Sequence, residues 1–173
     1  LERNVPLLVL FNLEIIPERS NHRQYHFLFG GLKEVEQDLK KLNIPFFLTI
    51  GKSGDSVVAF LEEHNVGELV MDFNPLQYAL NRRDAVLKHI AIHAVEVDAR
   101  NIIPCWYASD KEEFAAYTFR PKVHRKLGEF LKKFPTVKEH PYTHKKNPQK
   151  IDWDVLLGSL SIDRTVKPVT KII

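Results

Sequence analysis

Four short apolar runs, separated by segments of helical pattern, are the feature that most restricts how this chain can fold. The runs are Pro6–Phe11, Phe46–Ile50, Leu69–Asp72 and Ala94–Asp98. Each has the length of a strand, and the unbroken apolar character of the first is typical of a parallel strand buried on both faces. The alternation predicts an α/β fold, a three-layer Rossmann-like parallel sheet with helices on both faces and right-handed crossovers.

The helices expected between these strands follow from the spacing of apolar side chains. Within Tyr25–Leu42 they recur at alternating steps of three and four residues, which places them on one stripe of a long helix. Asn21, with a glutamine three residues later, predicts its start, and Pro45 requires it to end before the second strand. Shorter helices are expected after the turn Gly51–Asp55 and over residues 76–89.

The pattern changes after the fourth strand. Ser109, with a glutamate three residues later, predicts a capping box at the start of a short helix. Pro121 suits the first turn of another helix, whose apolar stripe runs from Val123 to Phe134. Pro135–Lys150 is rich in proline and lysine and is expected to be an extended linker. Asp152–Leu160 is expected to form a last short helix, and the tail beyond it shows no obvious means of burying itself.

The length of 173 residues fits one domain better than two. We expect an α/β domain over residues 1–134 and, over residues 135–173, a linker and the start of a connection to a further domain. Cys105 is the single cysteine, so an intramolecular disulfide is impossible and a reducing compartment is indicated. Its apolar neighbours predict a buried, inert thiol.

The longest apolar run is far shorter than the roughly 20 residues that span a bilayer, so no membrane partner is expected. The expected location is intracellular: cytoplasmic in a prokaryote, nuclear or organellar in a eukaryote. The net charge is +3, but Lys111–Lys150 holds 11 basic and 4 acidic residues, a net charge of +7. Such a stretch could meet phosphate or an acidic surface, or could simply be a solvated helix face and linker.

The turn after the second strand lacks the full pattern of a phosphate-binding loop. Gly51 is followed by Lys52 and Ser53, but Phe46 stands where the first glycine of that loop would be required. What remains is a helix N-terminus, which could hold an anion through its free N–H groups. A simple strand-to-helix connection is the better explanation of this turn.

No set of residues suggests a metal site or a catalytic centre. His22 and His26 have a spacing that could bind a metal, but no third ligand accompanies them, so none is assigned. No serine lies in a nucleophile-elbow pattern, and no residue is assigned a catalytic role. Asp72 and Asp98 end strands, at the sheet edge where open parallel sheets bind ligands, although such residues are as often helix caps or turn formers.

Seven stretches, taken together, carry a family resemblance. They are Tyr25–Glu36, Leu42–Phe46, Val70–Leu76, Val97–Trp106, Ala108–Lys122, Glu139–Tyr142 and Ile151–Trp153. In this order and spacing they resemble the N-terminal α/β domain of class II cyclobutane pyrimidine dimer photolyases, in the photolyase/cryptochrome family. Asn-Ile-Ile-Pro-Cys-Trp at 101–106 and Ala-Ser-Asp-Lys at 108–111 are similar to class II in particular.

The resemblance implies a light-driven lyase that repairs UV-damaged DNA. In the family, reduced FAD in a C-terminal helical domain donates an electron to a flipped-out pyrimidine dimer, and the N-terminal domain carries a deazaflavin or flavin antenna. Since that helical domain would follow Ile173, this chain alone is expected to be inactive. The family's first strand would precede Leu1, so Pro6–Phe11 and Leu69–Asp72 are expected to face a gap in the sheet.

The resemblance, with the position of ligands in such sheets, also suggests where an antenna would bind. The residues expected to form its walls are Asn12, Leu13, Phe73, Asn74 and Leu76. Asn74 and Gln77 stand where relatives have serine and arginine, which weakens the inference at this turn. The partner expected for this chain is the helical FAD-binding domain of the same polypeptide. The residues expected to dock against it are Cys105, Trp106, Phe119, Arg120 and Lys122.

Two other functions stay open at this point. The domain could be a scaffold without a chromophore that supports the helical domain. It could also be a stand-alone module that binds a nucleotide or an anion at Gly51–Asp55. The basic stretch fits an interdomain role better than DNA binding, because the relatives contact DNA mainly through the helical domain.

Overall fold

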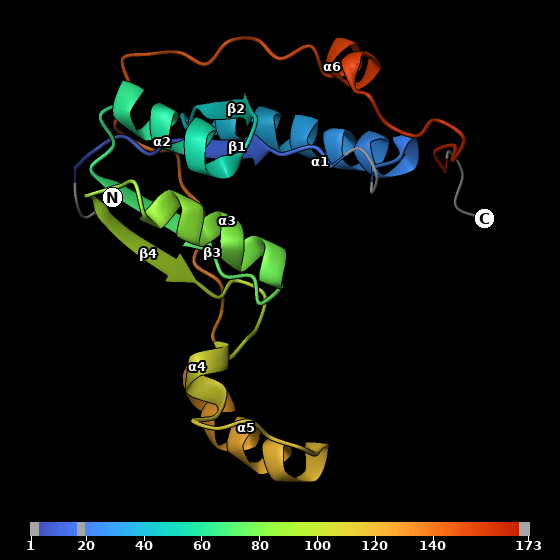
Figure 1. Ribbon diagram of the computed structural model, residues 1–173. Helices are drawn as coiled ribbons and strands as arrows, with labels where there is room; N and C mark the ends of the chain where they lie inside the picture. The colour runs from blue at the N-terminus through green and yellow to red at the C-terminus, as the bar shows by residue number, and fades with distance from the viewer. Residues whose placement is uncertain (1–3, 17–19, 170–173) are drawn as a thin grey trace. The chain divides into compact units, whose positions relative to one another are not determined.

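The computed structural model describes residues 4–16 and 20–169, which form two compact units. The first unit consists of Leu1–His64 with Lys138–Ile173, and the second consists of Asn65–Val137. Each has its own pair of parallel strands (Figure 1). Parallel strands flanked by helices confirm the α/β class.

The first unit is built on strands β1 (Val9–Leu13) and β2 (Phe46–Ile50), with Val9 opposite Phe46 and Leu13 opposite Ile50. β1 begins three residues later and ends two residues later than predicted. The reason is that pairing starts where the Val9 N–H donates to the Pro45 carbonyl at 3.0 Å. Asn12 and Leu13 therefore lie within the strand rather than after it.

Helices cover both faces of this sheet (Figure 1). On one face Val9, Phe11 and Leu13 join the core formed with α1 (His22–Lys41). On the other face the neighbouring strand residues contact α2 (Ser53–Glu63), for example through the rings of Phe47 and Phe60, whose centroids are 5.1 Å apart. This arrangement follows from the alternation of side chains along a strand.

The predicted bounds of α1 are confirmed. Asn21 forms a capping box with Gln24, each side chain accepting from the other residue's backbone N–H. At the other end Asn43 adopts a left-handed φ of 57°, and the Ile44 N–H donates to the Leu39 carbonyl at 2.9 Å. Asparagine tolerates this conformation better than most residues, so the chain turns sharply into β2.

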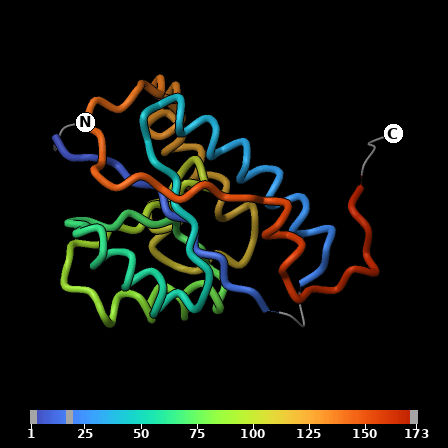
Figure 2. The backbone as a smooth tube through the Cα atoms, turned by 90° about the horizontal axis from the view of Figure 1, so that it is seen from above, coloured from blue at the N-terminus to red at the C-terminus, as the bar shows by residue number. Residues whose placement is uncertain are grey.

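The C-terminal segment belongs to the core of the first unit. The short helix predicted over Asp152–Leu160 is present, and beyond it Ile162 packs against the core, although the sequence shows no obvious means of burial there. Helix α6 (Trp153–Ser159) packs against α1, and Figure 2 shows this part of the chain running beside α1. Leu160 is buried, and Asp163 pairs with Asn21, with the His22 N–H donating to the Asp163 carbonyl at 2.7 Å. The paired backbone shows why burial is possible without a longer apolar run.

Residues 135–150 form neither helix nor strand, as predicted for a linker, but residues 138–150 are anchored to the first unit. His140 is buried, its N–H donates to the Leu42 carbonyl at 2.7 Å, and its carbonyl accepts from Asn43 Nδ2 at 2.7 Å. Lys146 Nζ lies 3.1 Å from Glu63 Oε1 and lowers the pKa of that carboxyl.

The second unit contains β3 (Glu68–Asp72) paired in parallel with β4 (His93–Val97), with Glu68 opposite His93. Helix α3 (Gln77–Leu87) connects them. Two further helices follow, α4 (Cys105–Ala108) and α5 (Ala116–Phe130). Among the described residues each sheet has two strands, so β1 and β3 each have a single neighbouring strand.

Three predictions for this part of the chain are wrong. Ser109 starts no helix: its hydroxyl accepts from the Lys111 N–H at 3.3 Å and donates to the Glu113 carboxylate at 2.9 Å, but the residues that follow form a bend rather than a helix. Helix α5 begins at Ala116 and runs through Pro121, although proline cannot donate a helical hydrogen bond. Its apolar stripe is not buried, since no residue of α5 is buried. Cys105 is exposed rather than buried.

The core of the first unit gives a stability prediction. Phe29 is 3% exposed and its ring packs on Tyr25 and Trp153, whereas Phe27 on the same helix is 85% exposed. We expect Phe29→Ala to lower the free energy of unfolding by about 3–5 kcal/mol, because a large cavity replaces the ring. The control Phe27→Ala should change it by no more than about 0.5 kcal/mol. Chemical denaturation followed by tryptophan fluorescence measures both, and equal effects would contradict this packing.

Candidate functional site

At the carboxyl end of β1 and β2, the hydrogen bonds of Asn12 are fully used within the protein. Its Nδ2 donates to the Gly51 carbonyl at 3.2 Å and to Ser53 Oγ at 3.1 Å. Its Oδ1 accepts from the hydroxyls of Thr49 and Ser56, both at 2.8 Å. Because an amide side chain has two donor hydrogens and two acceptor lone pairs, none is left for a ligand.

Leu13, the second residue expected at this end, lies in the core. It is 4% exposed and packs with the residues that α1 buries against the sheet. Its carbonyl accepts from the Gly51 N–H at 3.0 Å. Both residues therefore serve to hold β1 against β2 and α2.

The N-terminus of α2 already holds a carboxylate of the protein. Glu14 Oε2 accepts from the Ser53 N–H at 3.3 Å and from Ser53 Oγ at 3.1 Å. The N-cap residue, Lys52, supplies no side-chain hydrogen bond. Negative charge is favoured at this end of a helix, so Glu14 takes the place that an external anion would occupy. Glu14 was not identified from the sequence, although its place just after a buried strand was a usable signal.

At the carboxyl end of β3, the predicted residues form a turn into α3. The Phe73 N–H donates to the Val97 carbonyl at 2.8 Å, and Asn74 Oδ1 accepts from the Leu76 N–H at 3.1 Å. Leu76 is the N-cap of α3 and is exposed. The ring of Phe73 meets that of Trp106 edge to face, with centroids 5.3 Å apart. The structure thus brings together one residue expected at an antenna and one expected at a domain interface.

Asp98 organises the loop that carries Trp106. Asp98 is buried, with 5% of its surface exposed. Its carboxylate accepts from the backbone N–H groups of Arg100, Asn101 and Cys105 at 3.0–3.2 Å. Asn101 Nδ2 donates to both carboxylate oxygens. These hydrogen bonds lower the pKa of Asp98, and the bond from the Asn101 side chain has the largest effect. The sequence leaves open whether Asp98 binds a ligand at the sheet edge or stabilises a cap or turn. In the structure it stabilises the turn after β4.

The ammonium group of Lys122 forms an ion pair within the second unit, so it is not available to a partner domain. Its Nζ lies 2.6 Å from Glu113 Oε1 and 2.9 Å from Ser109 Oγ. Hydrogen bonds from Lys122, Thr118 and Ser109 lower the pKa of Glu113 to about 2, and the pair raises the pKa of Lys122. Glu113 is not predicted from the sequence, because the capping-box pattern pairs Ser109 with Glu112 instead. This pair fixes the segment between α4 and α5.

The other residues expected at a domain interface are exposed. Cys105, Trp106 and Arg120 are exposed, and Phe119 is 39% exposed. Three further exposed aromatic residues lie near them in the sequence: Tyr107, Phe114 and Tyr117. Aromatic side chains at a surface are typical of interfaces.

The two groups of predicted antenna residues belong to different units. Asn12 and Leu13 lie in the first unit, and the turn Phe73–Leu76 lies in the second. In the described part of the chain, no group of three histidine, cysteine or acidic side chains could hold a metal ion. Nor does any helix among residues 4–16 and 20–169 have the length and apolar character to cross a membrane.

These features define an α/β domain with parallel strands, whose carboxyl strand ends carry polar and aromatic side chains but no catalytic group assigned from the sequence. The family model described as DNA photolyase matches residues 1–140. The chain therefore belongs to the DNA photolyase family.

Relatives in three kingdoms carry the same name. A deoxyribodipyrimidine photo-lyase of Potorous tridactylus is 40% identical over 174 positions, which cover 98% of this chain and 32% of the relative. One of Arabidopsis thaliana is 36% identical, covering 91% and 32%, and one of Methanothermobacter thermautotrophicus is 31% identical, covering 73% and 28%. The chain thus spans about a third of the length of these relatives.

The Glu113–Lys122 pair predicts a dependence of stability on pH. Folding lowers the pKa of Glu113 from 4.5 to about 2, so the folded state favours its charged form. The stabilisation is complete above pH 4.5 and is lost as the pH falls toward 2. Glu113→Gln should lower the unfolding midpoint at neutral pH, and its difference from the wild type should shrink across this window. Thermal unfolding at a series of pH values measures it.

Glu112→Gln provides the matched control. Glu112 is exposed and has no hydrogen-bond or ion-pair partner among the described residues, and the substitution removes the same charge. It should leave the midpoint nearly unchanged. A difference for Glu113→Gln that stays constant down to pH 2 would contradict the role given to the ion pair.

Proposed function

We propose that this chain is the N-terminal antenna-type domain of a class II deoxyribodipyrimidine photolyase, which repairs cyclobutane pyrimidine dimers in UV-damaged DNA with light. The observation that carries the proposal is the alignment of 98% of the chain with a relative of that name at 40% identity. The segments 101–106 and 108–111 support class II, through the resemblance they carry.

In this proposal the chain contributes no catalytic residue. Since it spans about a third of its relatives, the reduced FAD that splits the dimer would be held by a helical domain outside residues 1–173. A deazaflavin or flavin antenna, when bound, absorbs light and passes the energy to that FAD. The residues of this chain would bind and orient the antenna and present a surface to the helical domain.

The turn between β3 and α3 is the part of the chain best suited to contact a flat chromophore. It offers an exposed apolar side chain, Leu76, and an aromatic pair, Phe73 and Trp106, at the carboxyl end of a parallel strand pair. Such strand ends are where open α/β sheets bind ligands. Asn12 and Leu13 lie in the first unit, where their side chains are already used, so they add no free polar group for a chromophore.

The exposed residues Cys105, Trp106, Phe119 and Arg120 would form the docking surface for the helical domain. Lys122 would act there indirectly, because its ion pair with Glu113 holds the segment that carries this surface. Exposed aromatic rings on α5 and before it favour burial by a partner over permanent contact with water.

A second candidate is a scaffold without a chromophore. The full use of Asn12 and the burial of Leu13 favour it, because these two of the five expected antenna residues have no side-chain group free to contact a chromophore. The third possibility, an anion- or nucleotide-binding module at Gly51–Asp55, is disfavoured, because Glu14 occupies the N-terminus of α2.

The antenna is tested by expressing the chain in a host that makes a deazaflavin and measuring near-ultraviolet and visible absorbance after purification. We expect the chromophore to co-purify, whereas a folded but colourless protein would favour the scaffold.

Leu76→Asp sharpens this test. Aspartate is a better N-cap than leucine, so α3 should be stabilised while a charge enters the apolar wall. The variant should lose most of the bound chromophore. Val155→Asp, at an exposed apolar position in the first turn of α6, adds the same charge in the other unit and should retain it. Equal chromophore content in the two variants would exclude the turn as the binding site.

The docking surface is tested in the full-length protein encoded by the source reading frame. We expect the reading frame to encode a helical FAD-binding domain after residue 173. Phe119→Glu should then weaken domain association and reduce the FAD retained on purification, because it places a charge in an apolar interface. Phe27→Glu, at an exposed phenylalanine of the first unit, is the control and should retain FAD. Unchanged FAD content in Phe119→Glu would argue against this surface.

A further inference from the structure

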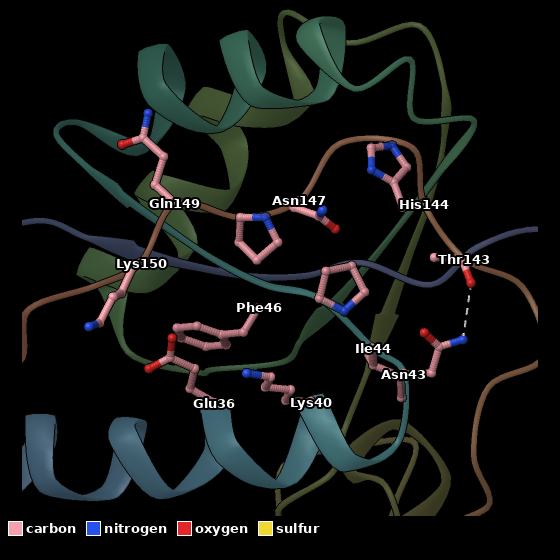
Figure 3. Close-up of a pocket in the computed structure, with 12 residues that line it drawn as sticks. Glu36, Lys40, Asn43, Ile44, Phe46, Thr143, His144, Asn147, Gln149 and Lys150 are labelled. Carbon is pink, nitrogen blue, oxygen red and sulfur yellow. Dashed lines mark hydrogen bonds between the residues drawn. The ribbon is translucent and has the colours of Figure 1, made fainter.

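A pocket of about 530 Å³ lies in the first unit, between the C-terminal part of α1, the start of β2 and the segment 143–150. Figure 3 shows Glu36 and Lys40 rising from α1 toward Phe46, with residues 143–150 on the far side. This volume is within the range of small-molecule sites in proteins, about 300–1,000 Å³. The segment that closes the pocket is held in place by the hydrogen bonds of His140 and the ion pair of Lys146.

The lining of the pocket combines apolar side chains with amides. The apolar wall is made by Ile44, Pro45, Phe46 and Pro148. Asn147 and Gln149 flank Pro148 in the lining, and their side-chain amides have no hydrogen-bond partner among the described residues. Each amide offers a donor and an acceptor side by side, the pattern that hydrogen bonds to the edge of a heteroaromatic ring require.

The pocket also has a surplus of positive charge. Lys40 comes from α1 and Lys150 from the extended segment, and neither ammonium group forms an ion pair within the described part of the chain. Glu36 is the acidic residue in the lining, and its Oε2 accepts from Trp153 Nε1 at 2.7 Å. Two ammonium groups against one carboxylate favour an anion with more than one negative oxygen.

We propose that this pocket binds a nucleoside monophosphate, a planar heteroaromatic ring joined to a phosphate. The ring would lie on the proline and phenylalanine wall with its edge toward Asn147 and Gln149. The phosphate would lie between Lys40 and Lys150. The apolar wall alone would accept many small molecules, and the lysines alone would accept any anion. It is their occurrence in one pocket that selects this class.

This site is separate from the edge proposed for the antenna. Phe46 is the first residue of β2, so the pocket is at the amino end of that strand, while Asn12 and Gly51 lie toward its carboxyl end. It also shares no residue with the N-terminus of α2, which Glu14 occupies. The inference does not depend on the proposed function.

The test is a titration of the full chain with AMP, adenosine and inorganic phosphate, followed by calorimetry and by the NMR signals of the side-chain amides. AMP should bind and shift the amide signals of Asn147 and Gln149. Adenosine and inorganic phosphate should each bind more weakly, because each lacks one half of the contacts. Phosphate binding as tightly as AMP would show a plain anion site and overturn the proposal, as would no binding of AMP.

Two substitutions give effects of opposite sign. The double variant Lys40→Ala, Lys150→Ala should weaken AMP binding about tenfold or more, because charged hydrogen bonds are lost. Glu36→Gln should tighten it, because the opposing charge is removed while an acceptor for Trp153 remains. A merely structural role of Glu36 would not increase affinity. Wild-type affinity in the double variant, or weaker binding in Glu36→Gln, would contradict the placement of the phosphate.

The control is Lys33→Ala with Lys145→Ala. Lys33 is exposed on α1 and Lys145 is exposed in the same extended segment, but neither lines the pocket. This variant removes the same total charge and should keep the affinity within about twofold, apart from a small screened effect that disappears at higher salt. An equal loss in both double variants would mean that AMP responds to overall charge, and the proposal would fail.

Discussion

The insertion of Trp153 against α1 and β2 is the interaction on which the first unit depends. Its ring packs on Phe29 and Phe46, with centroids 5.4 and 6.2 Å away, and its N–H donates to Glu36. The N–H of a buried tryptophan usually has a hydrogen-bond acceptor, and here Glu36 supplies one. The same contact fixes the end of the segment that lines the pocket and places the Glu36 carboxylate within it. Trp153 therefore contributes to the packing of the core, to the position of the segment that lines the pocket and to the position of the Glu36 carboxylate.

The sequence predicts the parts of this fold that local chemistry determines. The bounds of α1 follow from the Asn21 capping box and from Pro45, and β2 matches its apolar run. Interactions between distant residues escape such reasoning. Leu160 is buried, and Glu14 caps a helix that begins 39 residues later. In α5 the apolar periodicity is present but unburied, because periodicity predicts a helix and an apolar face without specifying what covers that face.

The same limit applies to the candidate site. The topology rule directs attention to the carboxyl ends of the strands, but it cannot tell a free side chain from one that already has hydrogen-bond partners within the protein. Asn12 is saturated by hydroxyls of β2 and α2, whereas Leu76 is left exposed. The basic residues around Lys122 in the sequence predict an exposed cation, but its ammonium group is paired with the Glu113 carboxylate. Only the partners, which lie elsewhere in the chain, decide between these outcomes.

The first unit is discontinuous in sequence, and this has a consequence for how the chain reaches its native state. Residues 138–169 complete a core whose other half ends at His64, while the second unit is formed by the contiguous residues between them. During synthesis α1 and its sheet emerge long before Trp153, so their apolar faces stay open until the whole intervening segment has left the ribosome. Contacts of such large sequence separation slow folding. The second unit is therefore free to fold first, and residues 138–169 then complete the core that α1 and its sheet began.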